Sequence, residues 1–303
     1  MKCPYCNSEN TKKAGKSTSG KQKNFCRDWR KHLPDQPKSW TTELKNGGRP
    51  KILIFDIETS TVRAWVWRTG KQFVGPKQVL QESFILSWSA KWLFESKVIH
   101  DRVTGEEAIA RDDKRVVEHL WRMMDSANII IAHNLNNFDR KKANARFLKH
   151  RLFHPSPYQT IDTLAIARRE FQIESNSLDY LCKYLGLPRK MDTDYELWLD
   201  CENGDEKALK KMDRYCRHDT RILEDVYLEL RPYMHSHPNI GLYLGNDSVK
   251  CTNCGSDKLT PTKDYVTPAN KYPSYRCECG AITRIRAGSL NAFDRVEGRS
   301  VAR

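Results

Sequence analysis

The chain has 303 residues, of which 39% are apolar, so it can build the core of one large domain or of a medium-sized domain with smaller ones attached. It has no apolar run of about 18 residues that would span a membrane, and it opens without the apolar segment of a signal peptide. We therefore expect a soluble cytoplasmic protein in a reducing compartment. The formal charge of +14 lies at the ends: residues 1–50 hold 12 Lys and Arg against 4 Asp and Glu, residues 241–303 hold 10 against 6, and residues 51–240 hold 30 against 28. This asymmetry favours contact with a polyanion such as nucleic acid.

The first 33 residues carry an incomplete pattern of metal-binding cysteines. A Cys-x2-Cys pair is followed, 19 residues later, by a single cysteine, and Trp29 stands where a second pair would place its last ligand. A histidine three residues further on is the best substitute, and Asp28 is a poorer one. We expect a structural Zn²⁺ in an N-terminal zinc ribbon, held by Cys3, Cys6, Cys26 and His32. Contact with nucleic acid is a hypothesis for the basic residues of this segment, which are Lys12, Lys13, Lys16, Lys21, Lys23, Arg27 and Arg30.

A linker rich in Pro, Gly and Lys at residues 34–50 leads into the sequence KILIFDIET, residues 51–59. In a strand, alternate side chains share a face, so Asp56 and Glu58 point the same way. The β-branched residues around them indicate a strand covered on both sides, where an unpaired carboxylate is costly. A positively charged group must therefore lie beside these two carboxylates.

Residues 51–240 are expected to form a mixed α/β domain, because three early strands are followed by alternating helices and a further strand. Strands are predicted at 64–74, 83–94, 97–103 and 128–132. Helices are predicted at 112–125, 140–151 and about 205–234, with the segments 160–170 and 177–185 between the last two as part of the alternating helices. The spacing of four tryptophans favours strand faces and core over base stacking; these are Trp65, Trp67, Trp88 and Trp92.

Two further acids occupy telling positions. Asp219 lies in the middle of the apolar stripe of the long helix, and Tyr215 lies one turn earlier on the same side. Asp139 follows the strand at 128–132 and opens a helix, where it could reach the acids of the first strand or act as a helix cap. Taken alone, Asp219 is more simply explained as the partner of an internal Arg or as the cap of a neighbouring element. Four carboxylates gathered at one sheet edge require cations between them, and an all-oxygen ligand set favours Mg²⁺ or Mn²⁺.

Several other residues near these acids are open to more than one interpretation. Asp162 either steadies the site or caps a helix. His133 and His218 adjoin key residues but are not expected to be catalytic. Three cysteines are expected to be core or surface thiols, namely Cys182, Cys201 and Cys216.

The C-terminal segment, residues 241–290, contains a complete set of zinc ligands. Two short cysteine pairs are separated by 22 residues, and a glycine follows each pair, which suits tight turns around one tetrahedral Zn²⁺. The expected ligands are Cys251, Cys254, Cys277 and Cys279. Disulfides are the alternative, but a reducing compartment disfavours them. Both cysteine-rich segments resemble the zinc ribbons at the ends of transposases and other nucleic-acid proteins, and either could be purely structural. Residues 291–303 form a basic tail.

Three motifs of the central segment resemble those of a known exonuclease family. They are FDIET at residues 55–59, Asn134-x3-Phe138-Asp139, and Tyr215-x3-Asp219. Their order and spacing are similar to the DEDD superfamily in its tyrosine variant, most closely the proofreading domain of family-B DNA polymerases. The resemblance covers about residues 50–235. It implies an RNase H-like sheet flanked by helices and metal-dependent 3′ to 5′ hydrolysis of phosphodiester bonds.

The resemblance also implies a role for each motif residue. Asp56 would bridge two metal ions, Glu58 and Asp219 would complete the shell of the first, and Asp139 would support the second, partly through water. Tyr215 would orient the attacking water, with Glu58 as a possible helper. The resemblance also places three residues near the terminal nucleotide, but this part of it is less specific than the motif acids. These residues are Thr59, Asn134 and Phe138.

The sequence departs from the polymerase-linked exonucleases in having zinc ribbons and too few residues after 240 for a polymerase domain. Substrate choice could therefore differ, and no residue pattern separates DNA from RNA. We favour DNA, single-stranded or at ends, as substrate, with replication or repair proteins as conceivable partners. Two other functional hypotheses remain: a catalytically silent nucleic-acid-binding scaffold, and an endonuclease or strand-transfer enzyme on the same fold.

Overall fold

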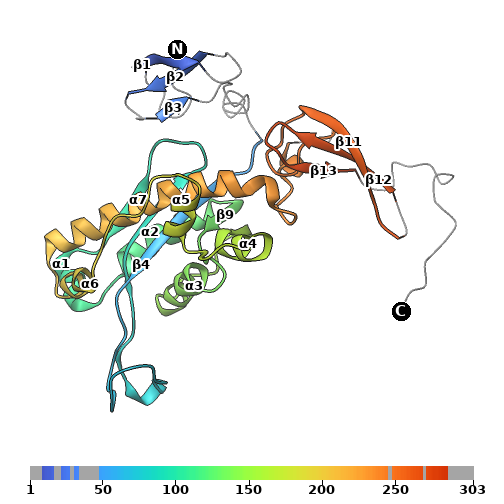
Figure 1. Ribbon diagram of the computed structural model, residues 1–303. Coiled ribbons are helices and arrows are strands. Elements are labelled where there is room, and N and C mark those ends of the chain that lie inside the picture. The colour runs from blue at the N-terminus through green and yellow to red at the C-terminus, as the bar shows by residue number, and fades with distance from the viewer. Residues whose placement is uncertain are drawn as a thin grey trace. The chain divides into compact units, whose positions relative to one another are not determined.

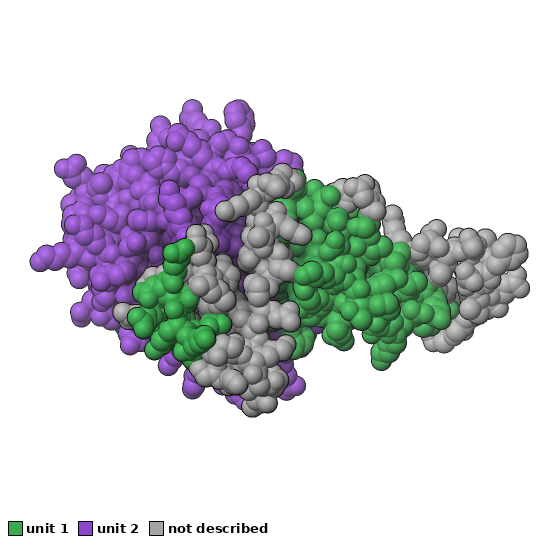
Figure 2. Space-filling model, turned by 90° about the horizontal axis from the view of Figure 1, so that it is seen from above, with its two compact units in different colours: residues 1–50, 229–303 green, residues 51–228 purple. Residues whose placement is uncertain are grey.

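The computed structural model describes residues 9–16, 22–27, 31–33, 48–244, 248–268 and 271–285. The chain divides into two compact units, one of residues 51–228 and one of residues 1–50 together with 229–303 (Figure 2). Among the described residues, none of the helices combines the length and the apolar character needed to cross a bilayer.

A five-stranded mixed sheet forms the centre of the first unit (Figure 1). Its order is β10-β9-β4-β7-β8, with β4 paired antiparallel to β7 and parallel to β9. The remaining pairs are β7 with β8, antiparallel, and β9 with β10, parallel. The strands are β4 (Ile52–Thr59), β7 (Ile85–Trp92), β8 (Ile99–Arg102), β9 (Ile129–Ala132) and β10 (Gln159–Asp162). This is the mixed α/β architecture expected from the sequence, and it is consistent with an RNase H-like exonuclease fold.

Seven α-helices of this unit lie around the sheet (Figure 1). Four begin at a side chain that accepts a hydrogen bond from the first turn, at Thr104, Asp162, Ser177 and Asp194, which fixes where each helix starts. The helices are α1 (Gly105–Ala110), α2 (Lys114–Asp125), α3 (Asp139–Lys149), α4 (Thr163–Glu170), α5 (Leu178–Tyr184), α6 (Tyr195–Glu202) and α7 (Glu206–Leu230).

The core lies between the sheet and these helices. Leu53, Phe55 and Ile57 of β4 are buried in it, and the Trp88 indole donates to the Val116 carbonyl at 2.9 Å. Trp88 and Trp92 thus pack with the core as predicted. Four stretches differ from the sequence prediction. Helices α1 and α6 were not predicted, and the segment 160–170 opens with β10 before it becomes α4.

The fourth difference is residues 64–74, which were predicted as a strand. Only a short ladder forms there, between β5 (Arg63–Ala64) and β6 (Val79–Gln81), with the 3-10 helix η3 (Pro76–Gln78) leading into β6. Trp65 and Trp67 are exposed, so the prediction that they lie on strand faces or in the core was wrong. The alternation of apolar and polar residues over 64–74 did not predict burial, because no described sheet or helix packs against the faces of the β5–β6 ladder.

The second unit contains two small antiparallel sheets. The N-terminal sheet consists of β1 (Thr11–Lys16), β2 (Gln22–Cys26) and β3 (Lys31–Leu33). Cys3 and Cys6, and the side chains of Cys26 and His32, lie outside the described part of the chain, as does the predicted basic tail. The C-terminal part holds the 3-10 helices η4 (Arg231–Tyr233) and η5 (Ile240–Tyr243) and the sheet of β11 (Leu259–Val266), β12 (Lys271–Cys277) and β13 (Ile282–Arg284).

Candidate active site

The site is built where helix α7 packs across strands β4 and β7. Buried hydrogen bonds fix this contact: the Ser89 hydroxyl of β7 donates to the Cys216 carbonyl at 2.8 Å, and the Cys216 thiol lies 3.5 Å from the backbone oxygen of Asp56. The small side chains of Ser89 and Cys216 let the helix approach the sheet closely. Asp56 and Glu58 therefore face the turn of α7 that carries Asp219.

Three of the four predicted acids meet in one group. Asp56, Glu58 and Asp219 each offer a carboxylate oxygen, and these oxygens all lie within 4.8 Å of one another. Asp219 is only 1% exposed, and its Oδ1 has no hydrogen-bond partner within the described residues. A buried, incompletely bonded carboxylate is costly unless a cation completes its surroundings.

The fourth acid, Asp139, lies beside this group. It is the first residue of α3, is 2% exposed, and its Oδ2 is unbonded among the described residues. Burial and the neighbouring Asp56 charge raise the pKa of Asp139 well above its usual value. It is thus close enough to sense Asp56, although it lies outside the three-residue group.

The pKa values of all four acids are raised. Burial, followed by the charge of Asp219, raises the pKa of Asp56 to about 7. Burial and the charge of Asp56 raise the pKa of Glu58 well above its usual value, and burial raises that of Asp219. Each shift reports that the charged carboxylate is unfavourable in this pocket without more positive charge. Raised pKa values of this kind are typical of functional sites.

One cation is already present in the pocket, and the sequence analysis missed it. The Lys190 ammonium lies 2.5 Å from Asp219 Oδ2 and 4.9 Å from the centre of the Tyr215 ring. Burial alone would lower the pKa of Lys190, but the charges of Asp219, Tyr215 and Asp56 raise it. Lys190 lies between α5 and α6, far from every motif, so only a search for the missing counter-charge could have pointed to it.

Tyr215 lies beside the same acids, one turn of α7 before Asp219. The residue is 7% exposed, and its ring packs edge-on against Trp198 of α6, with ring centroids 6.2 Å apart. Burial and the charge of Asp219 raise the pKa of Tyr215, so the hydroxyl keeps its proton at neutral pH. It can therefore act as a hydrogen-bond donor beside the acids.

Residues 66–191 match a family model of exonucleases. The match includes Asp139 and Lys190, begins after Asp56 and Glu58, and ends before Tyr215 and Asp219. No curated protein matches the chain. Together with the acid group, the match supports a nuclease that acts on nucleic acid.

Within the matched segment, Asp162 holds the loop that leads to Asp139. Its carboxylate accepts from Leu164 N and Ala165 N at 3.1 Å, which caps α4. It also accepts from Asn134 N at 3.1 Å and Asn136 N at 3.0 Å. Asp162 thus caps α4, one of the two roles that the sequence left open, and it also holds the backbone of the loop that precedes Asp139.

The remaining predicted residues lie around the same loop. Asn134 has a left-handed backbone (φ 75°), and Phe138 is half-buried and packs on the core just before Asp139. Thr59 ends β4, directly after Glu58. Their contact with the terminal nucleotide stays a prediction.

The two histidines take part in ordinary structural hydrogen bonds. His133 Nδ1 lies 2.9 Å from the Thr163 hydroxyl, and His218 Nε2 lies 2.7 Å from the Arg189 carbonyl. Burial lowers the pKa of His133 to about 4, so it is neutral near pH 7. The three central cysteines are buried free thiols, as expected: Cys182, Cys201 and Cys216.

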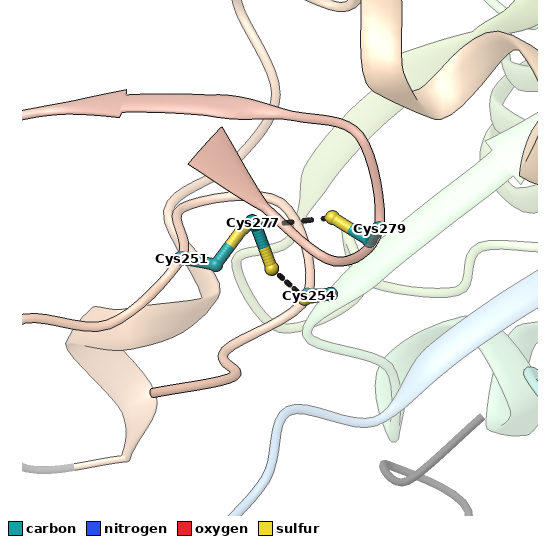
Figure 3. Close-up of side chains that lie close together, drawn as sticks. All are labelled: Cys251, Cys254, Cys277 and Cys279. Carbon is teal, nitrogen blue, oxygen red and sulfur yellow. Dashed lines mark hydrogen bonds between the residues drawn. The ribbon is translucent and has the colours of Figure 1, made fainter. Parts of the chain in front are cut away.

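A second candidate metal site lies in the C-terminal sheet. Four thiols, two from the turn before β11 and two from the end of β12, point toward one another (Figure 3). Cys251 and Cys279 sulfurs are 3.7 Å apart, and Cys254 and Cys277 sulfurs 3.5 Å apart. Four thiolates around a tetrahedral Zn²⁺, at about 2.3 Å each, lie about 3.8 Å apart. The cluster has the right ligands and nearly the right spacing for zinc, and the cysteines are free rather than paired in disulfides.

Proposed function

We propose that the protein is a metal-dependent 3′ to 5′ exonuclease that hydrolyses DNA, either single-stranded or at ends. The observation that carries the proposal is the group of three carboxylates from β4 and α7, whose oxygens lie within 4.8 Å of one another, in a chain whose residues 66–191 match a family model of exonucleases. The 3′ to 5′ direction is supported by the tyrosine variant of the third motif, Tyr215-x3-Asp219.

The acids fit a pair of divalent ions. All candidate ligands are carboxylate oxygens, which suit Mg²⁺ or Mn²⁺, and two of them, Asp139 Oδ2 and Asp219 Oδ1, are buried without a partner among the described residues. Asp56, Glu58 and Asp219 would hold one ion, with Asp56 shared and Asp139 supporting the second. Such ions would supply a hydroxide nucleophile at neutral pH and offset the negative charge that develops on the departing 3′ oxygen.

The chain's own side chains would position the reactants. The protonated Tyr215 hydroxyl can donate to the attacking water or to a phosphate oxygen, and its ring is held in place by Trp198. Asp162 keeps the loop of Asn134 and Asp139 in place. Orientation of this kind is a large part of catalysis in phosphoryl transfer.

A labelled oligonucleotide tests the activity and its direction. With Mg²⁺ or Mn²⁺, the purified protein should shorten a 5′-labelled single strand stepwise, and Asp56→Ala should abolish this. The matched control is Asp213→Asn, which changes another buried acid of α7 that instead contacts His100 at 2.7 Å and Arg217 at 3.1 Å. Full activity of a clean Asp56→Ala preparation would refute the mechanism.

The same assay distinguishes the exonuclease from the two other functional hypotheses. A circular single strand has no free end, so its cleavage would indicate an endonuclease or strand-transfer enzyme. No hydrolysis with either metal, but retained binding, would indicate a silent scaffold. Matched DNA and RNA strands of one sequence decide the substrate.

We also propose that the C-terminal cysteines hold a structural Zn²⁺, and that a second Zn²⁺ is held by the N-terminal set. The support for the first is the sulfur spacing, and for the second it is the sequence pattern. Small segments of this kind need a metal to fold stably.

A further inference from the structure

Residues 60–82 form an arm that leaves the exonuclease domain directly after the strand that carries Asp56 and Glu58. In Figure 1 the arm, with the β5–β6 ladder, projects from the body of the unit. Ser60 at its start is two residues from Glu58. Any molecule bound at the root of the arm is therefore next to the candidate active site.

The root of the arm is firmly anchored. Thr61 donates from its backbone N and from its hydroxyl to Glu202 Oε1, both at 2.7 Å. On the returning side, Arg111 Nη2 donates to the Glu82 carbonyl at 2.8 Å. Ser60 N also donates to the Phe84 carbonyl at 2.9 Å, which closes the two ends against each other. The arm is thus attached at both ends by defined contacts.

The arm also has internal structure. Trp65 N donates to the Gln78 carbonyl at 2.9 Å, and the Gln78 side chain donates back to the Trp65 carbonyl at 3.0 Å. Gly75 N donates to the Gln78 side chain at 2.8 Å. These bonds hold the ribbon together without any core of its own.

Large aromatic rings are left in solvent on this ribbon. Trp67 is 96% exposed, Phe73 87% and Trp65 70%, whereas Trp88 in the core is 2% exposed. Exposing rings of this size to water is unfavourable, because burial of apolar surface is the main favourable term in folding. A group of such rings on an anchored arm marks an interaction surface.

The charges of the arm decide the kind of partner. Residues 60–82 contain four basic residues, Arg63, Arg68, Lys71 and Lys77, against one acidic residue, Glu82, which is the last residue of the arm. Arg63 pairs with Glu202 at 3.3 Å, whereas Arg68, Lys71 and Lys77 form no ion pair within the described part of the chain. Aromatic rings interleaved with such cations match the two components of a single strand, which are bases that stack and phosphates that carry negative charge.

We propose that the arm binds single-stranded nucleic acid, with Trp67 and Phe73 stacking on bases and Arg68 and Lys71 contacting phosphates. The proposal rests on the proposed function, because nucleic acid is the substrate that brings a strand to this edge of the domain. The arm would hold the strand beyond the cleaved bond. It would therefore raise affinity for long substrates and have no effect on hydrolysis of a single nucleotide ester.

Replacement of the rings tests the arm directly. The double variant Trp67→Ala/Phe73→Ala removes only exposed side chains, and Phe153→Ala is the matched control, since Phe153 is 88% exposed and lies outside the arm.

Loss of one base–aromatic stack corresponds to about 5- to 150-fold in affinity. We expect the double variant to raise KM for a single-stranded oligonucleotide at least about fivefold, with kcat kept. The p-nitrophenyl ester of thymidine 5′-monophosphate should be hydrolysed at the wild-type rate. An unchanged KM for the oligonucleotide would overturn the proposal.

Binding without hydrolysis separates this proposal from the proposed function. Fluorescence anisotropy of a labelled oligo(dT) in EDTA should show weaker binding by the double variant than by the wild type and Phe153→Ala, whether or not the protein hydrolyses DNA. If the wild type hydrolyses DNA and the double variant binds as well as the wild type, the arm proposal fails alone. If light scattering shows that the double variant only loses self-association, with oligo(dT) binding unchanged, the rings serve a second copy of the chain and the proposal is overturned.

The phosphate contacts have their own signature. For single strands, the slope of log affinity against log salt changes by about 0.7 for each phosphate that the protein no longer neutralises. We expect Arg68→Gln/Lys71→Gln to flatten that slope by about 1.4. The same slope as the wild type would remove these two residues from the binding surface.

Discussion

At the scale of single residues, the site is a problem of charge balance. Asp56, Glu58 and Asp219 bring three carboxylates together at the contact of β4 and α7, and Lys190 is the positive side chain that the described structure places against Asp219. One ammonium cannot neutralise three carboxylates. The pKa values of the three acids are raised because negative charge in the group remains uncompensated. Two divalent ions would supply the missing positive charge.

Removal of Lys190 should shift the pH dependence of the enzyme. Because its charge lowers the pKa of Asp56, Lys190→Met should raise that pKa above about 7 and move the rising limb of the pH–activity profile to higher pH. The control is Lys183→Met, on the neighbouring helix α5, where the ammonium lies 5.6 Å from the Tyr180 ring. The measurement is kcat/KM against pH at fixed Mn²⁺. A profile that keeps its midpoint would show that Lys190 does not act on the acids.

The raised pKa of Asp56 also predicts how stability depends on pH without metal. The folded state holds the proton of Asp56 up to about pH 7, whereas the unfolded chain releases it near the usual value of 3.8. The contribution of Asp56 to stability is therefore full below that usual value and is lost as pH rises through about 7. Asp56→Asn mimics the protonated form, so in EDTA its stability advantage over the wild type should widen with pH across this window. The check is urea unfolding of both proteins at several pH values. A constant difference would contradict the assignment.

At the scale of elements, short side chains join helices and loops to the sheet at the site. Asp162 is the clearest case, because one carboxylate caps α4 and also accepts from the backbone of Asn134 and Asn136. The helix start and the loop before Asp139 are thus a single structural unit. Substitution of Asp162 should therefore destabilise both the start of α4 and the loop before Asp139.

Asp162→Ala should lower the free energy of unfolding by about 1–3 kcal/mol, from loss of a cap and of hydrogen bonds to a charged group. It should also lower kcat, because the loop of Asn134 and Asp139 loses its anchor. Ser177→Ala is the control, since Ser177 caps α5 in the same way and should cost about 1 kcal/mol with activity kept. Denaturant unfolding and kcat measure the two effects. Wild-type kcat in a destabilised Asp162→Ala would limit the residue to capping.

At the scale of the whole molecule, the unit of residues 51–228, which contains the segment similar to exonucleases, is combined with a second unit that has little core of its own among the described residues. The buried residues around the C-terminal cysteines are few, and the thiols themselves form the centre of the cluster. Such a segment depends on its metal for stability, whereas the sheet of residues 51–228 has a large core.

Cys254→Ser should remove one zinc ion per chain, because Cys254 is one of the four thiols that approach one another. Zinc is counted by mass spectrometry of the purified protein. Cys201→Ser is the control, since Cys201 is a buried free thiol of the unit of residues 51–228 and lies outside the cluster. The variant should unfold in two thermal steps, and the melting temperature of the unit of residues 51–228 should stay at its wild-type value. Equal zinc content in Cys254→Ser and wild type would exclude the cluster as the site.

The sequence by itself determined the elements whose chemistry is local. Strand β4 with its two acids on one face, the stripe of α7 with Tyr215 and Asp219, and the paired cysteines all follow from periodicity and spacing. The tertiary structure decided what depends on contacts between distant segments: Lys190 as counter-charge of Asp219, Asp162 as the tether of the Asn134 loop, and Trp65 and Trp67 in solvent instead of the core. Periodicity reports which side chains share a face, but whether that face is covered depends on which elements pack against it, and none of the described helices or sheets covers the rings of the arm.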